Sequence, residues 1–346
     1  MPDQSFFLPL PKVEIHSHLE GSITPITLYE LAHKNNRESE FGQSLKACEN
    51  LYKFTNFDGF LNSFSKANNF IKNSSDFDVI LKNSVELLKK ENYMYIEYFI
   101  SMDTFIKKNI PLTALLDQLR ECKKRYSNQD FMIGGFIIDF VRNYGPNNAL
   151  AILYDLQPIL DDYRDVILGI SIGGDETNFP ATPFREVFEK ARSVKMRLKT
   201  TAHAGESTNA QSVWDTILNL RTDRIGHGLR SHESDDLIKH LRATQTPLEI
   251  CPTSNLKTGL IKSLDQHPIR DYFDNGVYVT VNTDDPGFFN NSLSGELQLL
   301  QETFNFSNEE LNAIILNAAK SCFLNELSKK ELLEKLKIRL ENFAIY

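Results

Sequence analysis

Short apolar runs recur along the chain and alternate with longer amphipathic segments. Eight runs rich in β-branched and aromatic residues predict strands, at 12–15, 93–100, 131–140, 166–172, 198–202, 224–228, 246–251 and 277–282. Segments between them space apolar residues three or four apart and predict helices, at 77–92, 113–126, 148–160, 184–194, 209–220 and 234–243. This alternation is typical of a parallel α/β fold.

Eight predicted strands that alternate with helices indicate a (β/α)8 TIM barrel. The interval 24–92 is too long for one crossover, so we expect extra helices after the first strand to form a lid over the C-terminal face. An open doubly wound sheet is the alternative, but no GxGxxG motif follows any strand. No Pro-, Gly- or Ser-rich linker interrupts the chain, and we expect one domain over 1–346.

Charge and composition narrow the function classes. The net charge is −8 and no Lys/Arg cluster stands out, which argues against nucleic acid or a membrane surface as a partner and leaves a small molecule. No apolar run reaches about 18 residues, and the N-terminus lacks the basic start of a signal peptide. Four scattered cysteines suit a reducing, cytoplasmic setting. The pattern leaves the oligomeric state open.

Side chains with metal-binding chemistry stand at the ends of the predicted strands. His16 and His18 end the first strand, and residues two apart on a strand point to the same face, so both imidazoles can reach one cation. His203 after the fifth strand and Asp284 after the eighth would complete three nitrogens and one oxygen. Such a set, with room for a water, is typical of a catalytic zinc.

Three more ionisable groups follow the same strand ends. Glu206 lies three residues past His203, where it could be a general acid toward a ring nitrogen or a first-turn acid of the next helix. His227, between two glycines, could orient or deprotonate the water or stabilise an oxyanion. Asp285 could hold the water or accept a hydrogen bond from substrate.

These motifs resemble the adenosine deaminase family of amidohydrolases. The similarity covers residues 10 to about 325, in family order, through LPKVEIHSHLEGSI, GGDE, TAHAGE, RIGHG, CPTSN, NTDDPG and NAAKSCFL. It implies a barrel with one Zn²⁺ per chain that hydrolyses the 6-amino group of a purine and releases ammonia. It also implies that the zinc ligands are His16, His18, His203 and Asp284.

The resemblance assigns further roles residue by residue. Glu206 matches the acid that protonates purine N1, and His227 matches the histidine that activates the attacking hydroxide. Asp285 matches the carboxylate at N7, and Gly174 matches the glycine whose amide meets N3. The expected substrate contacts are therefore His18, Glu20, Gly174, Asp285 and, in the lid region, Phe57 and Phe60.

The motifs favour a nucleoside substrate. Gly226 of RIGHG and the GDE of 174–176 differ from the adenine deaminases of the family, which resemble RIDHG and lack GDE. Many adenosine deaminases carry HLDG, whose Asp meets the ribose 5′-hydroxyl; Glu20 here is longer by about 1.5 Å. We expect adenosine or deoxyadenosine, with aminodeoxyfutalosine, N6-methyl-AMP and adenine as alternatives. The sequence places no basic residue near a 5′-phosphate.

A catalytically silent purine-nucleoside binding protein is the alternative from another class. Loss of a metal ligand or of Glu206 would indicate it, and none is lost. The remaining histidines occur in helical or loop segments and are expected to be structural or on the surface; they are His33, His232, His240 and His267.

Overall fold

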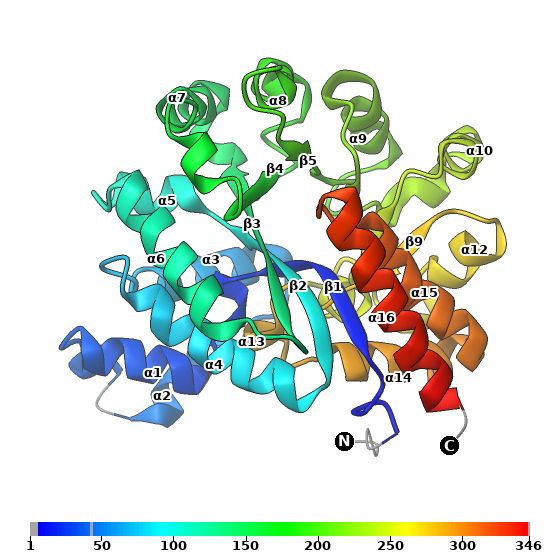
Figure 1. Cartoon of the computed structure of the whole chain (residues 1–346), viewed down its shortest axis with the longest axis horizontal. Coiled ribbons are helices and arrows are strands. Elements are labelled where there is room, and N and C mark those ends of the chain that lie inside the picture. The colour runs from blue at the N-terminus through cyan, green and yellow to red at the C-terminus, as the bar shows by residue number, and fades with distance from the viewer. Residues whose placement is uncertain (1–5, 42–43, 345–346) are drawn as a thin grey trace.

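Parallel strands form the centre of the structure, a computed structural model that describes residues 6–41 and 44–344 (Figure 1). One sheet contains, in spatial order, β1 (Lys12–His18), β2 (Tyr93–Ile100), β3 (Met132–Val141), β4 (Ile167–Gly173) and β5 (Lys199–Thr200). The other contains β6 (His203–Ala204), β7 (Ile225–His227), β8 (Leu248–Ile250) and β9 (Val279–Val281). All adjacent pairs are parallel.

The two sheets join at both edges into a barrel. β5 and β6 share one strand position, because the Thr201 N–H donates to β4 (3.0 Å) while the Ala202 carbonyl accepts from β7 (2.8 Å). At the other edge, Ser17 of β1 forms a parallel bridge with Asp284, just after β9. The predicted (β/α)8 barrel is confirmed, and the fifth predicted strand, 198–202, is split by this irregularity.

Helices cover the outside of the barrel, and α7 to α10 form an arc beyond the strands in Figure 1. These outer helices are α4 (Asp76–Lys90), α6 (Leu112–Tyr126), α7 (Pro146–Leu156), α8 (Arg185–Arg192), α9 (Ala210–Asp215) with a π-helical extension (Thr216–Leu220), α10 (Asp235–Thr244), α12 (Ile269–Asp274), α14 (Leu293–Phe304), α15 (Asn308–Ser321) and α16 (Glu326–Ala344). Their apolar faces pack on strands that are buried on both sides, as expected for a parallel barrel.

A second set of helices lies in the connections that follow the carboxyl ends of the strands. They are α1 (Pro25–Lys34), α2 (Leu45–Leu51) and α3 (Phe57–Asn68) after β1, α5 (Met102–Lys107) after β2, α11 (Pro252–Lys257) after β8 and α13 (Pro286–Phe289) after β9. Single 3₁₀ turns cover Glu20–Ser22, Glu38–Phe41, Arg142–Tyr144, Leu160–Tyr163, Thr182–Phe184, Leu229–Glu233 and Leu264–Gln266. In the described part of the chain, no helix combines the length and apolarity needed to cross a membrane.

The insertion before β2 is anchored by its own caps. The Asn56 side chain accepts from the Gly59 N–H and starts α3, and the Thr24 hydroxyl accepts from the Thr27 N–H and starts α1. Phe60 of α3 packs against Phe289 of α13, with ring centroids 5.0 Å apart. The inserted helix α3 therefore packs against α13, in the connection that follows β9.

Candidate active site

A cavity of about 450 Å³ lies at the carboxyl ends of the strands. Its inner end is lined by His18, His203, Glu206, His227, Asp284 and Asp285. Its outer walls are lined by α3, by α5 with the residue after it, and by the segments after β3 and β4. A cavity of this size holds a ligand larger than a single purine ring system.

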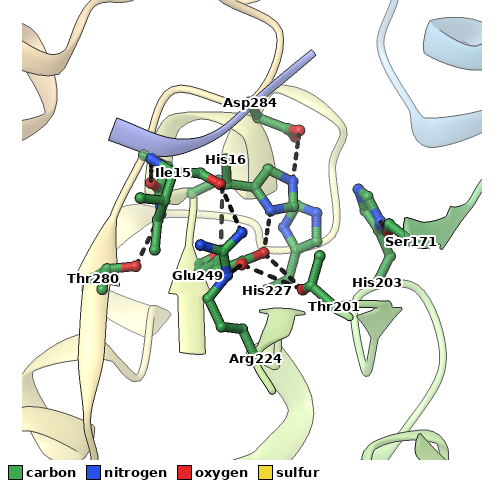
Figure 2. Close-up of polar contacts among 12 residues, drawn as sticks. Ile15, His16, Ser171, Thr201, His203, Arg224, His227, Glu249, Thr280 and Asp284 are labelled. Atoms are coloured by element: carbon green, nitrogen blue, oxygen red, sulfur yellow. Dashed lines mark hydrogen bonds and ion pairs between the residues drawn. The ribbon is translucent and has the colours of Figure 1, made fainter. Parts of the chain in front are cut away.

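Four predicted metal ligands converge at the inner end. Donor atoms of His16, His18, His203 and Asp284 all lie within 4.8 Å of one another. His18 Nε2 is 3.1 Å from His203 Nε2, and Asp284 Oδ1 is 3.3 Å from His18 Nε2. Figure 2 shows His16 between Asp284 and Glu249, with His203 to the right, beside Ser171.

The hydrogen-bond network fits a cation at this point. His16 Nδ1 donates to Glu249 Oε2 (2.7 Å), and His203 Nδ1 donates to the carbonyl of Ile172 (3.1 Å). Both protons therefore lie on Nδ1, and the Nε2 lone pairs of His16 and His203 face the same small space. His16 Nε2 is buried without a hydrogen-bond partner in the described chain. Converging lone pairs repel unless a cation lies between them.

A buried ionic network orients His16 from behind (Figure 2). Arg224 Nε lies 2.5 Å from Glu249 Oε1, and Arg224 Nη1 donates to Glu97 (2.8 Å). Burial by itself would raise the pKa of Glu249, but Arg224 and His16 outweigh burial and hold that pKa below its usual value. Glu249 thus remains an anionic acceptor that fixes the tautomer and angle of His16.

The backbone and a serine aim Asp284 at the same space. Asp284 adopts a left-handed φ of 66°, an uncommon conformation outside glycine that often marks functional sites. The Ser254 hydroxyl donates to Oδ2 (2.6 Å), which leaves Oδ1 toward the histidines. Burial would raise the pKa of Asp284, but the imidazoles of His16 and His18 beside it lower that pKa well below its usual value.

Glu176 of the GGDE motif positions the loop that carries Glu206. Its carboxylate accepts from the backbone N–H groups of Gly205 (2.6 Å), Glu206 (3.1 Å) and Ser207 (3.0 Å). Sequence reasoning quoted this motif but gave the glutamate no role. Glu176 follows β4, and the turn that it binds follows β6, at the next strand position of the barrel. No pattern in the sequence reveals a contact between two such segments.

Glu206 has the environment of a protonated carboxylic acid. Burial raises its pKa well above the usual value, and the negative charges of Asp284, Glu176 and Asp285 raise it further. A neutral carboxyl at the cavity wall can donate a proton. Asp285 lies beside it with a pKa raised by burial and by Asp284.

His227 is neutral and faces Glu206. Burial lowers the pKa of its imidazole to about 4. Its Nε2 lies 3.6 Å from Glu206 Oε1 and has no hydrogen-bond partner among the described residues. Its backbone has a φ of 58°, so both His227 and Asp284 hold left-handed conformations.

The predicted substrate contacts divide between the cavity wall and the interior. Gly174, Phe57 and Phe60 line the cavity. Gly174 has a φ of 97°, which favours glycine. Glu20 is fully buried beneath the wall, where its Oε1 accepts from the Ser101 N–H (2.7 Å) and its Oε2 has no partner in the described chain.

The structure adds cavity residues that sequence reasoning did not select. Asp139 lies at the end of β3, with Oδ2 4.0 Å from His18 Nδ1. Lys107 and Lys108 line the outer end, together with Tyr144. Asp139 follows the apolar residues FII of a strand, as the metal ligands follow theirs, so the sequence pattern could have identified it as a site residue. The two lysines follow no apolar strand, and no sequence pattern identifies them.

Comparisons with known proteins agree with this geometry. The adenosine deaminase family model matches residues 11–338. The adenine deaminases of Wolinella succinogenes and Crocosphaera subtropica are each 31% identical, over 94% and 93% of this chain and 97% of each relative.

Solved structures share the fold over almost the whole chain. An adenine deaminase from Arthrobacter aurescens has a TM-score of 0.87 at 24% identity, covering 96% of this chain and 99% of the other. A zinc-bound amidohydrolase from Burkholderia ambifaria has 0.85 at 22%, covering 99% and 95%. Arabidopsis ADAL complexed with IMP has 0.83 at 23%, covering 98% of each chain. At these identities the likeness shows the fold alone.

Proposed function

The chain belongs to the adenosine deaminase family and is a hydrolytic deaminase that acts on a C–N bond of a purine, and on this premise we propose that its substrate is a 6-aminopurine nucleoside with an anionic 5′ substituent. A 5′-monophosphate such as AMP or N6-methyl-AMP is the simplest such compound. The sequence-based preference for adenosine is not confirmed by the relatives, which are named adenine deaminases.

Two lysines at the outer end of the cavity carry the proposal. Lys108 Nζ donates to the backbone carbonyl of Asn68 (2.6 Å), and Lys107 Nζ lies 4.6 Å from the centre of the Tyr144 ring. All four residues line the cavity. Across residues 6–41 and 44–344, neither lysine forms an ion pair with a carboxylate. The sequence alone suggested no basic residue for a 5′-phosphate, and the proposal assigns that role to these two lysines.

The electrostatic environment favours an anion at these lysines. Burial lowers the pKa of Lys108 to about 8, and the nearby positive charge of Lys72 lowers it further. A ligand anion would offset both effects, since it favours the charged ammonium. The inner end of the cavity is acidic, so a ligand with its purine inside and its anion outside matches the charge distribution.

The other candidates fit less of the cavity. Free adenine has no group that reaches the lysines, although the names of the curated relatives favour it. Adenosine offers only a neutral hydroxyl there. Arabidopsis ADAL, which shares the fold, is complexed with IMP and with GMP, and these two ligands support a nucleotide.

The catalytic metal is proposed to be one Zn²⁺ per chain, held by His16, His18, His203 and Asp284. When bound, it would supply a Lewis acid and lower the pKa of water at the reacting carbon. The neighbour from Burkholderia ambifaria contains zinc, and three nitrogens with one carboxylate oxygen suit that ion.

The side chains at the inner end account for the proton transfers. Water oxygen adds to C6 while the Glu206 carboxyl protonates N1, so the N1–C6 double bond becomes single. The C6–N bond then breaks, and ammonia or methylamine leaves. One of the two protons of water returns to the Glu206 carboxylate, and the other leaves with the amine. We expect Asp285, whose pKa is raised by burial and by Asp284, to donate a hydrogen bond to a purine ring nitrogen.

We expect kcat/KM for AMP or N6-methyl-AMP to exceed that for adenosine by about 10- to 100-fold, the value of one charge-assisted hydrogen bond. The assay compares ammonia or methylamine release from these compounds, adenine and aminodeoxyfutalosine. Preference for aminodeoxyfutalosine, an adenosine with a 5′ aryl carboxylate, would retain the anion site and identify the anion as a carboxylate. Adenine or adenosine as the best substrate would overturn the proposal.

Lysine variants test the same site from the protein side. Lys107→Met and Lys108→Met should each lower kcat/KM for the nucleotide by about tenfold and leave the adenosine value within about threefold. Lys66→Met is the matched control, because Lys66 is exposed on α3 and does not line the cavity. Equal losses on nucleotide and adenosine would contradict a role for the lysines in anion binding.

Glu249→Gln tests the network behind the metal ligands. The amide oxygen can still accept from His16 Nδ1, but the negative charge that strengthens this bond is lost. We expect zinc affinity to fall about 10- to 100-fold. Competition with a chromogenic chelator measures it, and an unchanged affinity would show that the Glu249 charge does not support the site.

A further inference from the structure

A buried histidine outside the cavity is connected to His227. His267 lies just before α12, is 4% exposed, and was expected from sequence to be structural or on the surface. Its side chain reaches Asn255 of α11, and Asn255 reaches the His227 ring. The chain of contacts ends at His227 Nδ1, and the other ring nitrogen, Nε2, faces Glu206.

A backbone amide gives this chain of hydrogen bonds its direction. The Ile269 N–H donates to His267 Nδ1 (3.2 Å). An amide N–H can only donate, so Nδ1 must accept and the ring proton lies on Nε2. Burial lowers the pKa of His267 to about 3, with smaller effects of His232 and His227, so the ring carries one proton. His267 Nε2–H therefore donates to Asn255 Oδ1 (3.1 Å).

The hydrogen bond from His267 also fixes the orientation of the Asn255 side-chain amide. Because Oδ1 is taken by His267, the NH₂ group of Asn255 faces His227 Nδ1, at 3.5 Å. A flipped amide would need a proton on His267 Nδ1, which would then oppose the Ile269 N–H. His227 Nδ1 is thus an acceptor, and its single proton lies on Nε2.

We propose that Asn255 and His267 are positioning residues that hold His227 in the Nε2–H tautomer, so that His227 donates a hydrogen bond to the oxygen that attacks C6 and is not its base. The proposal deepens, and rests on, the deaminase function given above. The donated hydrogen bond strengthens as the oxygen gains negative charge in the tetrahedral adduct. It revises the sequence-based role of His227 as the residue that activates the nucleophile.

The tautomer can be observed directly in the metal-loaded protein. Histidine labelled with ¹⁵N gives separate NMR signals for protonated and unprotonated ring nitrogens, and His227→Asn assigns the signals of His227. We expect Nε2 to be protonated and Nδ1 to be unprotonated and hydrogen-bonded. A proton on Nδ1 would overturn the inference, whichever purine is the substrate.

Two variants distinguish an effect of hydrogen-bond direction on kcat from an effect of side-chain packing. Asn255→Asp presents only acceptors to His227, so we expect the proton to move to Nδ1 and kcat to fall about 10²-fold with little change in KM. His267→Gln can accept from Ile269 and donate to Asn255, so it should keep the tautomer and nearly normal kcat.

The outcomes of these variants are decisive in both directions. An Asn255→Asp enzyme with the wild-type tautomer and kcat would refute the role of Asn255. Equal losses in both variants with an unchanged His227 tautomer would show a packing role only and would also refute the proposal. The NMR result does not depend on substrate identity, so it remains informative if the nucleotide preference fails.

Discussion

Glu206→Gln is expected to lower kcat about 10³-fold while the protein keeps its metal. The substitution preserves the size of the side chain, and the loop remains clamped because Glu176 binds backbone N–H groups. A glutamine amide cannot supply the proton that N1 needs when C6 becomes tetrahedral, and loss of a general acid costs about 10²- to 10⁴-fold. Steady-state kinetics and metal analysis of the same sample give both readouts.

Glu186→Gln is the control for this substitution, because Glu186 is exposed on α8 and is not among the residues that line the cavity. We expect wild-type kinetics from it. Near-normal kcat in Glu206→Gln would show that Glu206 does not transfer the proton. Loss of metal in that variant would show that Glu206 supports the metal site instead.

The second large effect is expected from His203→Ala. It removes one of three converging Nε2 atoms, and with it the donor opposite His18. The site should lose most of its metal, and kcat should fall about 10⁴-fold, because a catalytic metal contributes several kcal/mol to the transition state. Metal content and ammonia release are measured together, before and after addition of zinc.

His33→Ala is the matched control, since the side chain of His33 is 77% exposed and pairs with Glu38 on the surface. Metal content and kcat should not change. A His203→Ala protein with full metal content and activity would contradict the assignment of the metal ligands.

The barrel and the inner end of its cavity were largely predictable because both follow from strand periodicity. Buried parallel strands are continuous apolar runs, so the polar residues that follow each run stand out. His16, His203 and Asp284 lie far apart in the chain, yet the geometry of a parallel barrel brings strand ends together.

The outer end could not be predicted in the same way. Lys107 and Lys108 lie at the end of a short helix, a usual place for solvated cations. They belong to the cavity only because the fold brings α3 and α5 to the same cavity wall. Glu20 shows the converse. Its motif suggested a ribose contact, but in the structure one carboxylate oxygen caps the Ser101 N–H beneath the cavity wall.

His267 shows a third limit of sequence reasoning. A histidine between a 3₁₀ turn and a helix gives no sign of burial, and its link to His227 depends on the fold of the segment after β8. Hydrogen-bond direction is set by a backbone amide, which every residue except proline has, so no residue type reveals it.

The proposed metal and nucleotide sites can be observed together in a crystal structure of the zinc-loaded protein with a 5′-nucleotide product such as IMP, with anomalous data at the zinc edge. We expect one zinc among His16, His18, His203 and Asp284, the purine against Glu206 and His227, and the phosphate at Lys107 and Lys108. A zinc bound elsewhere, or a nucleotide whose phosphate points away from the two lysines, would contradict the proposed sites.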